Sequence, residues 1–425
     1  MSNFNEFQRA AKAAIRVALQ WFFLAIPTGL ICGLVGTLFH LSVERVTELR
    51  ADQPWLLFLL PAAGLLITAL YKATKCEGVG TNNVIRAVQS GEPVSILLVP
   101  AIFLGTVLTH LCGGSAGREG AALQMGGSIG WNVGALLQLK DHDRRTATIS
   151  GMAAFFSALF GTPLTAALFA MMVEDVGLTF TSAFVPAFTS ALIAYGCSLA
   201  FGIGPTHFAI TAPELTVWNA FLVILLGFAC AAVSRLFCGL LHFMEHKVPQ
   251  LLPNPWLRVF VGGVAVIAFS YLFGVGRYNG AGMGVITAAV EQGEALPWDF
   301  LCKIFLTALT LSCGFKGGEV VPSFFVGATF GCVFGPLLGL PAGFAAAVGL
   351  VSIFCGATNA LIPSILLGFE LFSGAGLELI ALGCGICYML SGHHGLYSSQ
   401  TFVTNKLRSE YMSHKLRHKV KKQEE

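Results

Sequence analysis

The strongest constraint on this chain is a series of long apolar runs, which cover residues 18–41, 55–70, 94–111, 179–201, 217–241, 256–273 and 379–390. A helix needs about 20 apolar residues to cross roughly 30 Å of hydrocarbon. Several of these runs therefore cross a bilayer, and the shorter ones are expected to be tilted, partial or re-entrant. With 55% hydrophobic and 11% charged residues, the sequence predicts an all-α polytopic membrane protein.

Glycine interrupts these runs instead of collecting in linkers. The chain has 49 glycines and 17 prolines among its 425 residues. Broken backbone inside a bilayer is tolerated only where it is buried in protein or lines a water-filled cavity. The glycine pattern therefore predicts discontinuous helices.

The two ends of the chain indicate its orientation. Residues 1–17 lack the cleavage pattern of a signal peptide, so they are expected to form an amphipathic lead-in to the first span. Residues 404–425 carry seven Lys or Arg, and residues 140–145 carry three more. The positive-inside rule places both in the cytoplasm of a multi-pass protein of the cell (inner) membrane. The net charge of +3 reflects a solvated tail, and no nucleic acid partner is expected.

The 12 cysteines do not form a metal-binding pattern. The one C-x-x-C, from Cys384 to Cys387, lies inside an apolar run with no histidine or second pair at zinc spacing. Such cysteines behave as small apolar residues. We expect no metal and no cofactor.

The chain contains an internal repeat. Gly114, Gly117, Glu119, Gly127 and Pro163 recur in the same order as Gly314, Gly317, Glu319, Gly327 and Pro363. This spacing predicts a division near residue 210 into a first transmembrane repeat, 18–210, and a second, 211–403.

Glycine-interrupted segments at matching places in two halves are a pointer to a transporter binding site at the repeat interface. The N-terminal ends of broken helices carry unpaired N–H groups and the positive end of the helix dipole, which favour anions. We therefore expect an anion site near the membrane midplane, built by both halves.

Glu119 in "GREG" has two interpretations. A carboxylate at bilayer depth costs about 2.5 to 3.5 kcal/mol, so it faces a cavity, pairs or titrates. It is either half of a structural ion pair with Arg118, or a tethered anion that occupies the anion site when ionised and leaves it when protonated. Because adjacent helical residues point in different directions, Arg118 is expected to act through its position and field rather than by pairing.

Four motifs, "GREG", "GGEVVP", "GTPLTAALF" at Gly161 and "GLYSS" at Gly395, resemble those of the CLC family of chloride channels and anion/proton antiporters. The resemblance spans about residues 20 to 400. It implies a homodimer of all-helical subunits, each with an anion pathway between inverted repeats, and a dimer surface near Ala183 and Ile380. It also implies that Glu119 is the protonatable gate and that the anion-binding positions are Val79, Gly80, Arg118, Gly120, Val320, Val321 and Tyr397.

The departures from the chloride-selective pattern are similar to the fluoride/proton antiporter branch of the family. The first glycine turn, "GVGTNN", has no serine and carries an Asn pair. Met172 and Val173 stand where chloride/proton antiporters have two glutamates, and Glu174 follows one position later. Glu319 replaces an apolar residue and is a second expected proton-transfer group. Its alternative role is a carboxylate satisfied by peptide N–H groups or by Lys316.

Fluoride is strongly hydrated, so a binding site must supply close N–H donors and the positive edges of aromatic rings. Phe324 and Phe325 follow "GGEVVP", and ordinary packing is the expected role of at least one of them. The residues that could line the site further are Asn82, Asn83, Phe324 and Phe325.

These features together predict a secondary active transporter that exports fluoride in exchange for protons, with Glu119 as its gate. A chloride/proton antiporter or a passive chloride channel of the same fold is the alternative, because the fluoride branch often has methionine at the position of Val79. An intramembrane enzyme is a remote alternative, since neither H-E-x-x-H nor a Ser–His pair is evident. "GGSAGREG" lacks the Lys-Ser/Thr ending of a nucleotide-binding loop.

Overall fold

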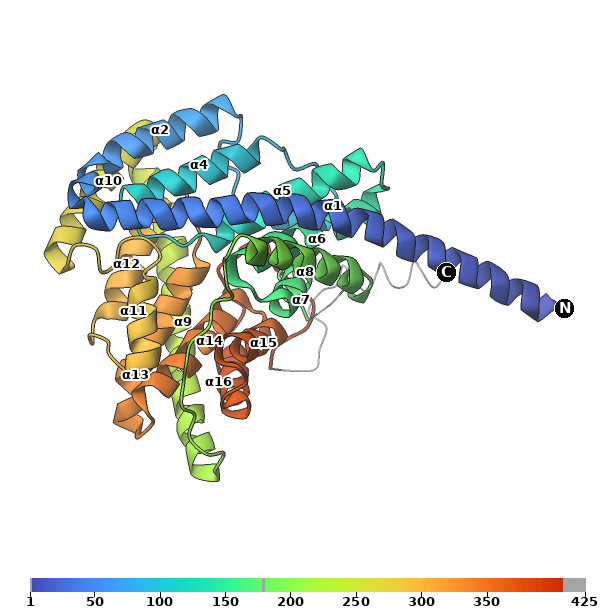
Figure 1. Ribbon diagram of the computed structural model, residues 1–425. Coiled ribbons are helices and arrows are strands. Elements are labelled where there is room, and N and C mark those ends of the chain that lie inside the picture. The colour runs from blue at the N-terminus through green and yellow to red at the C-terminus, as the bar shows by residue number, and fades with distance from the viewer. Residues whose placement is uncertain (1, 178–179, 408–425) are drawn as a thin grey trace.

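The structure, a computed structural model, describes residues 2–177 and 180–407. Within these residues the fold is helical, with two strands of two residues each (Figure 1). The helices of the first half are α1 (Ser2–Asp52), η1 (Pro54–Leu59), α2 (Leu60–Ala73), α3 (Thr81–Ser90), α4 (Leu98–Leu111), α5 (Glu119–Leu136), α6 (Asp141–Phe160), α7 (Pro163–Met172), η2 (Thr181–Ala183) and α8 (Phe184–Ala200).

The second half repeats this order. Its helices are α9 (Val217–Leu251), α10 (Pro255–Phe273), α11 (Met283–Thr287), η3 (Ala288–Gln292), α12 (Asp299–Ser312), α13 (Val320–Leu338), α14 (Ala342–Thr358), α15 (Leu361–Phe372) and α16 (Leu377–Leu390). Each half thus has one very long helix, α1 or α9, then one long and one short helix and a series of five more. The division predicted near residue 210 falls in segment 201–216, which joins α8 to α9.

Six helical segments are long and apolar enough to cross a membrane: Ile15–Asp52, Pro54–Ala73, Thr181–Ala200, Val217–Leu251, Pro255–Phe273 and Val320–Leu338. Five of them coincide with predicted runs. The runs at 94–111 and 379–390 form only the 14-residue helices α4 and α16, so they are partial spans, as expected for short runs. The sixth, α13, is not among the predicted long runs, although its apolar residues follow the second glycine cluster directly, where a broken helix is expected to begin.

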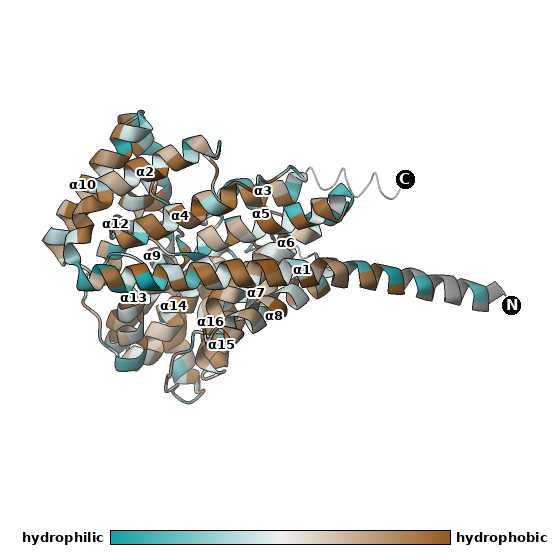
Figure 2. Cartoon of the chain, turned by 45° about the horizontal axis from the view of Figure 1, so that its top comes forward, coloured by the Kyte–Doolittle hydropathy of each residue, from teal (hydrophilic) through white to brown (hydrophobic). Residues whose placement is uncertain are grey.

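The lead-in at residues 1–17 is part of α1 from Ser2 onward, so α1 is one continuous helix of 51 residues that runs along one side of the molecule (Figure 1). Of the basic tail predicted at 404–425, residues 408–425 lie outside the described residues. Apolar residues cover most helix surfaces, while polar residues gather near helix ends and loops (Figure 2). This distribution is expected of a membrane protein, in which the helix surfaces that face lipid are apolar.

Glycine allows the closest helix pairs to touch through their backbones. A Cβ at Gly151 of α6 would lie 2.0 Å from the carbonyl oxygen of Gly126 in α5. In the second half, a Cβ at Gly349 of α14 would lie 2.3 Å from the carbonyl oxygen of Gly327 in α13. Small residues at such crossings let helices approach within van der Waals contact of their main chains. Both repeats therefore use the same device to bury their central helices.

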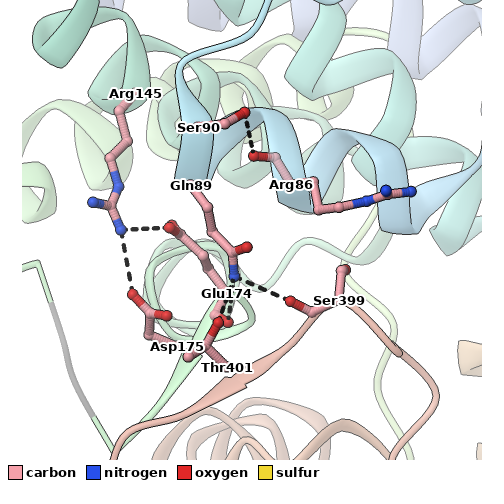
Figure 3. A network of polar contacts seen from close by, with 8 residues as sticks. All are labelled: Arg86, Gln89, Ser90, Arg145, Glu174, Asp175, Ser399 and Thr401. Atoms are coloured by element: carbon pink, nitrogen blue, oxygen red, sulfur yellow. Dashed lines mark hydrogen bonds and ion pairs between the residues drawn. The ribbon is translucent and has the colours of Figure 1, made fainter. Parts of the chain in front are cut away.

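The chain after α16 returns to the first half. Strand β2 (Thr401–Phe402) pairs in parallel with β1 (Asp175–Val176), with Asp175 opposite Thr401. Gln89 of α3 reinforces this junction, because its side-chain amide donates to the carbonyl oxygens of Glu174 and Ser399 and to the Thr401 hydroxyl (Figure 3). This junction holds the segment that contains Tyr397 against α3.

Candidate functional site

The two glycine clusters found in the sequence meet in the structure. Gly117 and Gly318 form an antiparallel bridge, in which each backbone N–H donates to the other's carbonyl oxygen, at 2.6 and 2.8 Å. The bridge lies immediately before α5 in one half and α13 in the other. It therefore brings the N-terminal ends of two buried helices together.

Glu119 lies at this junction. It is the first residue of α5 and is 0% exposed. Its Oε2 accepts a hydrogen bond from the backbone N–H of Arg118 at 2.9 Å, and its carboxylate also interacts with the backbone N–H of Val321 in α13. N–H groups at helix N-termini have no partner within their own helix and favour negative charge. The Glu119 carboxylate therefore lies between backbone N–H groups of the two halves, and that of Arg118 donates a hydrogen bond to it.

The side chain of Arg118 corrects one expectation. Its Nε lies 3.6 Å from Glu119 Oε1, so the two residues form an ion pair, although they are adjacent. The expectation that Arg118 acts without pairing was therefore wrong. Side chains of an α-helix lean toward its N-terminus, so the side chain of Glu119, the first residue of α5, lies toward Arg118.

Small residues make room for both glutamates. A Cβ at Gly117 would lie 2.7 Å from Glu119 Oε2, and a Cβ at Gly120 would lie 3.2 Å from Glu319 Oε2. Each carboxylate therefore packs against bare backbone of the "GREG" segment. The glycines of this motif therefore leave space for the two glutamate side chains, in addition to allowing the backbone to turn.

Glu319 is the N-cap residue of α13 and is 9% exposed. Within the described residues, no hydrogen bond or ion pair joins it to Lys316, whose ammonium lies instead over the ring of Tyr71. Glu319 lies within electrostatic range of Glu119, and also of His242 and Glu245 on α9. Val320 and Val321 follow it and are buried in the first turn of α13.

Tyr397 closes the same region from the C-terminal segment. It is 2% exposed, and its hydroxyl has no hydrogen-bond partner among the described residues. Glu319 and Glu119 both lie within electrostatic range of this hydroxyl. A buried, unpaired O–H group that faces two carboxylates is suited to donate to an anion.

The first glycine turn supports the site through its asparagines. Asn83 Oδ1 accepts from the backbone N–H of Gly80, which caps α3. Asn82 Oδ1 accepts from both the N–H and the hydroxyl of Ser399, two residues after Tyr397. Both amides therefore bind protein groups, and Asn82 fixes the Tyr397 segment. Val79 is half-buried against the apolar core.

The two phenylalanines after "GGEVVP" separate in space. Phe324 packs among other aromatic rings, at 5.1 Å from Phe354 with an edge-on geometry. Phe325 contacts the ring of Tyr278 and lies 5.1 Å from the ammonium of Lys303. Packing thus accounts for both rings, as expected for at least one of them.

Two polar residues of this region were missed from the sequence. Gln124 of α5 donates to the Thr81 hydroxyl at 3.1 Å, and the two side chains are buried. A Cβ at Gly120 would lie 3.5 Å from this hydroxyl, so both polar groups lie near the two glutamates. Thr81 follows the glycine turn directly and Gln124 lies five residues after Glu119, but neither spacing by itself indicates a contact.

A cavity of about 590 Å³ opens onto Arg118. Its lining includes the side chains of His40, Arg50, His110, Arg118 and Arg277, against Glu44 and Glu48. Two of its guanidinium groups are paired with acidic residues, Arg118 with Glu119 and Arg277 with Asp299, and the third, of Arg50, donates to the carbonyl oxygen of His110. The cavity therefore reaches the Arg118–Glu119 pair.

Glu174 lies away from this region. It is 1% exposed, directly before β1, and forms an ion pair with Arg145, which also contacts Asp175 (Figure 3). Val173 is fully buried, and Met172 ends α7. The carboxylate one position after the expected glutamate pair therefore belongs to the polar junction around β1 and β2.

Comparison with known proteins agrees with this architecture. A family model described as voltage gated chloride channel matches residues 62–392. A protein of Pseudomonas syringae pv. tomato named chloride/fluoride channel protein is 35% identical over 331 residues, which are 76% of this chain and 73% of that protein. The H(+)/Cl(-) exchange transporter ClcA of Vibrio cholerae is 27% identical over 361 residues, 78% of this chain and 75% of that one.

Among solved structures, a crystal structure of a CLC-type fluoride/proton antiporter superposes with a TM-score of 0.87 and 32% sequence identity. The match covers 91% of this chain and 98% of that chain. A cyanobacterial Cl-/H+ antiporter, at 19% identity and a TM-score of 0.75, shares the fold. The expected fold class is therefore confirmed, and the chain belongs to the voltage-gated chloride channel (CLC) family.

Proposed function

We propose that this chain exports fluoride in exchange for protons, with Glu119 as the protonatable gate. Glu119 takes a proton from outside and leaves the anion path, fluoride passes outward, and the carboxyl group then delivers its proton inward. Glu319 stabilises or receives this proton along the route. Under an inward proton gradient, the exchange expels fluoride.

One observation carries this proposal: the buried Glu119 carboxylate accepts a hydrogen bond from the backbone N–H of Arg118 in one half and lies near the backbone N–H of Val321 in the other. A carboxylate and a small anion are satisfied by the same donors. Protonation removes the negative charge that these donors favour, so it releases the carboxyl group and frees the site for the anion. Competition for one site couples proton and anion movement.

Fluoride as the anion is supported by the glutamate in the second glycine cluster. Glu319 lies beside Gly120 and within electrostatic range of Glu119, so two carboxyl groups share one buried region. The names of the relative and the structural neighbour described above, which include fluoride, agree with this choice. The proposed anion-binding positions are Val79, Gly80, Arg118, Gly120, Val320, Val321 and Tyr397.

Chloride/proton exchange is the second candidate, because this chain is also similar to the ClcA exchange transporters. Purified protein in proteoliposomes distinguishes the two when efflux is recorded with fluoride- and chloride-selective electrodes together with pH. We expect fluoride efflux accompanied by proton uptake and much slower chloride efflux. Equal rates for the two anions would contradict the fluoride assignment, and anion efflux without proton movement would indicate a channel.

The gate is tested by Glu119→Gln, which preserves the size of the side chain but cannot ionise. We expect proton transport linked to the anion to fall by at least about 100-fold, the scale of a lost acid–base group. Glu92→Gln, on an exposed residue between α3 and α4, is the matched control and should leave transport unchanged. Proton movement at the wild-type rate in Glu119→Gln would disprove the role of Glu119.

We also propose the arrangement of the whole chain in the cell (inner) membrane: a lead-in at 1–17, repeats at 18–210 and 211–403, and a basic tail at 404–425 on the cytoplasmic side. The basic residues of the tail and of loop 140–145 support this orientation. The functional unit is proposed to be a homodimer in which each subunit has its own anion path.

A further inference from the structure

A second cavity, of about 290 Å³, lies apart from the residues proposed to handle anions and protons. Its lining comes from α2, the glycine turn, the start of α10 and the second glycine cluster, and it includes Tyr71, Glu77, Arg258, Gly314 and Lys316. None of the residues proposed above as anion-binding or proton-transfer groups lines it. The cavity therefore needs an explanation of its own.

The polar groups in this cavity are mostly donors. The ammonium of Lys316 lies 4.1 Å from the centre of the Tyr71 ring, and Arg258 is close enough to repel it electrostatically. Within the described residues, no carboxylate lies at ion-pair distance from either cation. Two neighbouring cations without an acidic partner are stabilised by a bound anion.

Two unpaired buried atoms indicate where such an anion would bind. Tyr71 is 3% exposed, and its hydroxyl has no hydrogen-bond partner among the described residues. The Nε of Arg258 is also buried without a partner. Native proteins satisfy most buried donors, so unpaired O–H and N–H groups in one cavity point to a ligand that accepts hydrogen bonds.

The position of the cavity relative to the bilayer indicates which kind of anion binds there. Helices α2 and α10 are both candidate spans and pack antiparallel, because Gly64 lies against Val259 and Gly263 against Pro61. The end of α2, at Tyr71, therefore lies beside the start of α10, at Pro255. This is the level at which two spans leave the hydrocarbon, where lipid phosphates lie.

The surface beside the cavity suits the same level. The first turns of α10 expose Trp256 and Leu257, and tryptophan is enriched where membranes meet water. Lys72 and Lys75, at the end of α2, are exposed nearby. Basic pockets between transmembrane helices at this depth bind anionic lipid head groups.

We propose that this cavity binds the phosphate of an anionic phospholipid head group, through Arg258, Lys316 and the Tyr71 hydroxyl. The charged side chains supply charge-assisted hydrogen bonds to phosphate oxygens, and the phenol supplies a third donor. Glu77 is exposed in the lining and opposes the anion. Because Lys316 lies three residues before Glu319, a bound lipid would also steady the second glycine cluster.

The test measures lipid binding, so its outcome does not depend on the transported ion. Protein reconstituted in phosphatidylcholine vesicles, with or without phosphatidylglycerol, is extracted in mild detergent, and retained lipid is quantified by native mass spectrometry. We expect the wild type to retain phosphatidylglycerol in preference to phosphatidylcholine. Arg258→Gln and Lys316→Gln should each lower this retention by about tenfold or more, the scale of one lost charge-assisted contact.

Matched variants separate specific binding from general charge and from misfolding. Lys140→Gln removes an exposed positive charge outside the cavity lining, in the loop before α6, and should retain lipid like the wild type. Tyr71→Phe removes only the hydroxyl and should weaken retention without changing thermal stability, whereas Glu77→Gln should strengthen it. Glu119→Gln should bind lipid normally, whatever it does to transport.

Three results would overturn the proposal. Phosphatidylglycerol retention that is equal in the wild type, Arg258→Gln and Lys316→Gln would show that the cavity does not hold the head group. Stabilisation of the protein by inorganic phosphate, without retention of lipid, would make the ligand a soluble phosphate. Stabilisation by fluoride that requires Arg258 and Lys316, again without lipid, would make the cavity part of the ion path.

Discussion

At the scale of single residues, the missing side chain of Gly117 leaves room for the carboxylate of Glu119, the proposed gate. A Cβ there would be 2.7 Å from Glu119 Oε2 and 2.9 Å from the Cδ of Pro322. The carboxylate is the far end of a flexible side chain, so it is the group that would move. The glycine is therefore needed for the closed position of Glu119, in addition to its role in the bridge with Gly318.

We predict that Gly117→Ala displaces the Glu119 carboxylate. The variant should still fold, with a modest loss of stability, but the number of protons moved per anion should fall clearly. Overpacking of this kind costs about 1 to 3 kcal/mol of stability. Proton-to-anion ratios in proteoliposomes, together with thermal unfolding in detergent, check this expectation. An unchanged ratio would show that the carboxylate keeps its position or that its position does not matter.

Glu174 is a residue outside the membrane-spanning helices whose titration affects stability. Burial raises the pKa of its carboxyl group to about 7, although Arg145 acts in the opposite direction. Because this pKa lies above that of the unfolded chain, the folded state holds the proton more tightly. The free energy of unfolding therefore falls as the pH rises from the unfolded pKa, about 4.5, toward about 7.

We predict that Glu174→Gln reduces this pH dependence. The contribution of Glu174 across the window is at most about 3 kcal/mol, and the substitution removes it together with the ion pair to Arg145. Melting temperatures measured from about pH 4.5 to about pH 7 should decline less in the variant than in the wild type. The exposed Glu92→Gln should keep the wild-type slope, and the same slope in Glu174→Gln would contradict the prediction.

At the scale of helices, the paired crossings of α5 with α6 and of α13 with α14 form the buried centre of each half. Their glycines let backbone touch backbone, so the helix ends that carry Glu119 and Val320 are held without intervening side chains. Helix α8 also packs closely on glycines of α1, since a Cβ at Gly29 would lie 2.8 Å from the carbonyl oxygen of Ser190, and it exposes Val185 and Leu192. Rigid central helices are what a site built from their N-termini requires.

We predict that Gly151→Ala is strongly destabilising, because its Cβ would lie 2.0 Å from the carbonyl oxygen of Gly126. The expected loss is about 3 kcal/mol or more, since two backbones must separate. Gly239→Ala in α9 is the matched control, because no atom lies within 4 Å of its Cβ position. That variant should be neutral or up to about 1 kcal/mol more stable. Equal melting temperatures for the two variants would contradict this account of the crossing.

At the scale of the whole molecule, membership of the CLC family makes this chain a membrane transport protein, as expected, and not an intramembrane enzyme. The dimer surface expected near Ala183 and Ile380 needs adjustment, because both residues are buried within the subunit, at 1% and 0% exposed. Exposed apolar residues occur close by, at Val185 and Leu192 on α8 and at Ile362 and Phe369 on α15. These exposed side chains are able to contact a second subunit.

We predict that Ile362→Trp weakens a homodimer formed through α8 and α15, because a larger side chain disrupts a packed apolar interface. Phe260→Trp, on an exposed position of α10, is the control and should leave the assembly unchanged. Mass photometry in detergent measures the fractions of monomer and dimer. A wild-type protein that is monomeric, or a dimer that Ile362→Trp does not affect, would contradict this surface.

The amino-acid sequence alone determined the class of the protein, its repeat and the two matching glycine clusters that contain Glu119 and Glu319. These features depend on composition, apolar length and spacing, which are local properties. They also indicated that donors from both halves would converge, because glycine clusters precede apolar helices at matching positions.

Only the tertiary structure decided how these parts meet. The bridge between Gly117 and Gly318, and the bond from Ser399 to Asn82, join residues about 200 or more positions apart. The contact between the side chains of Glu119 and Arg118 appears only in the folded chain. The packing partners of Phe324 and Phe325 likewise come from other helices and loops. Such contacts depend on how distant helices pack, and no spacing along the chain specifies that packing.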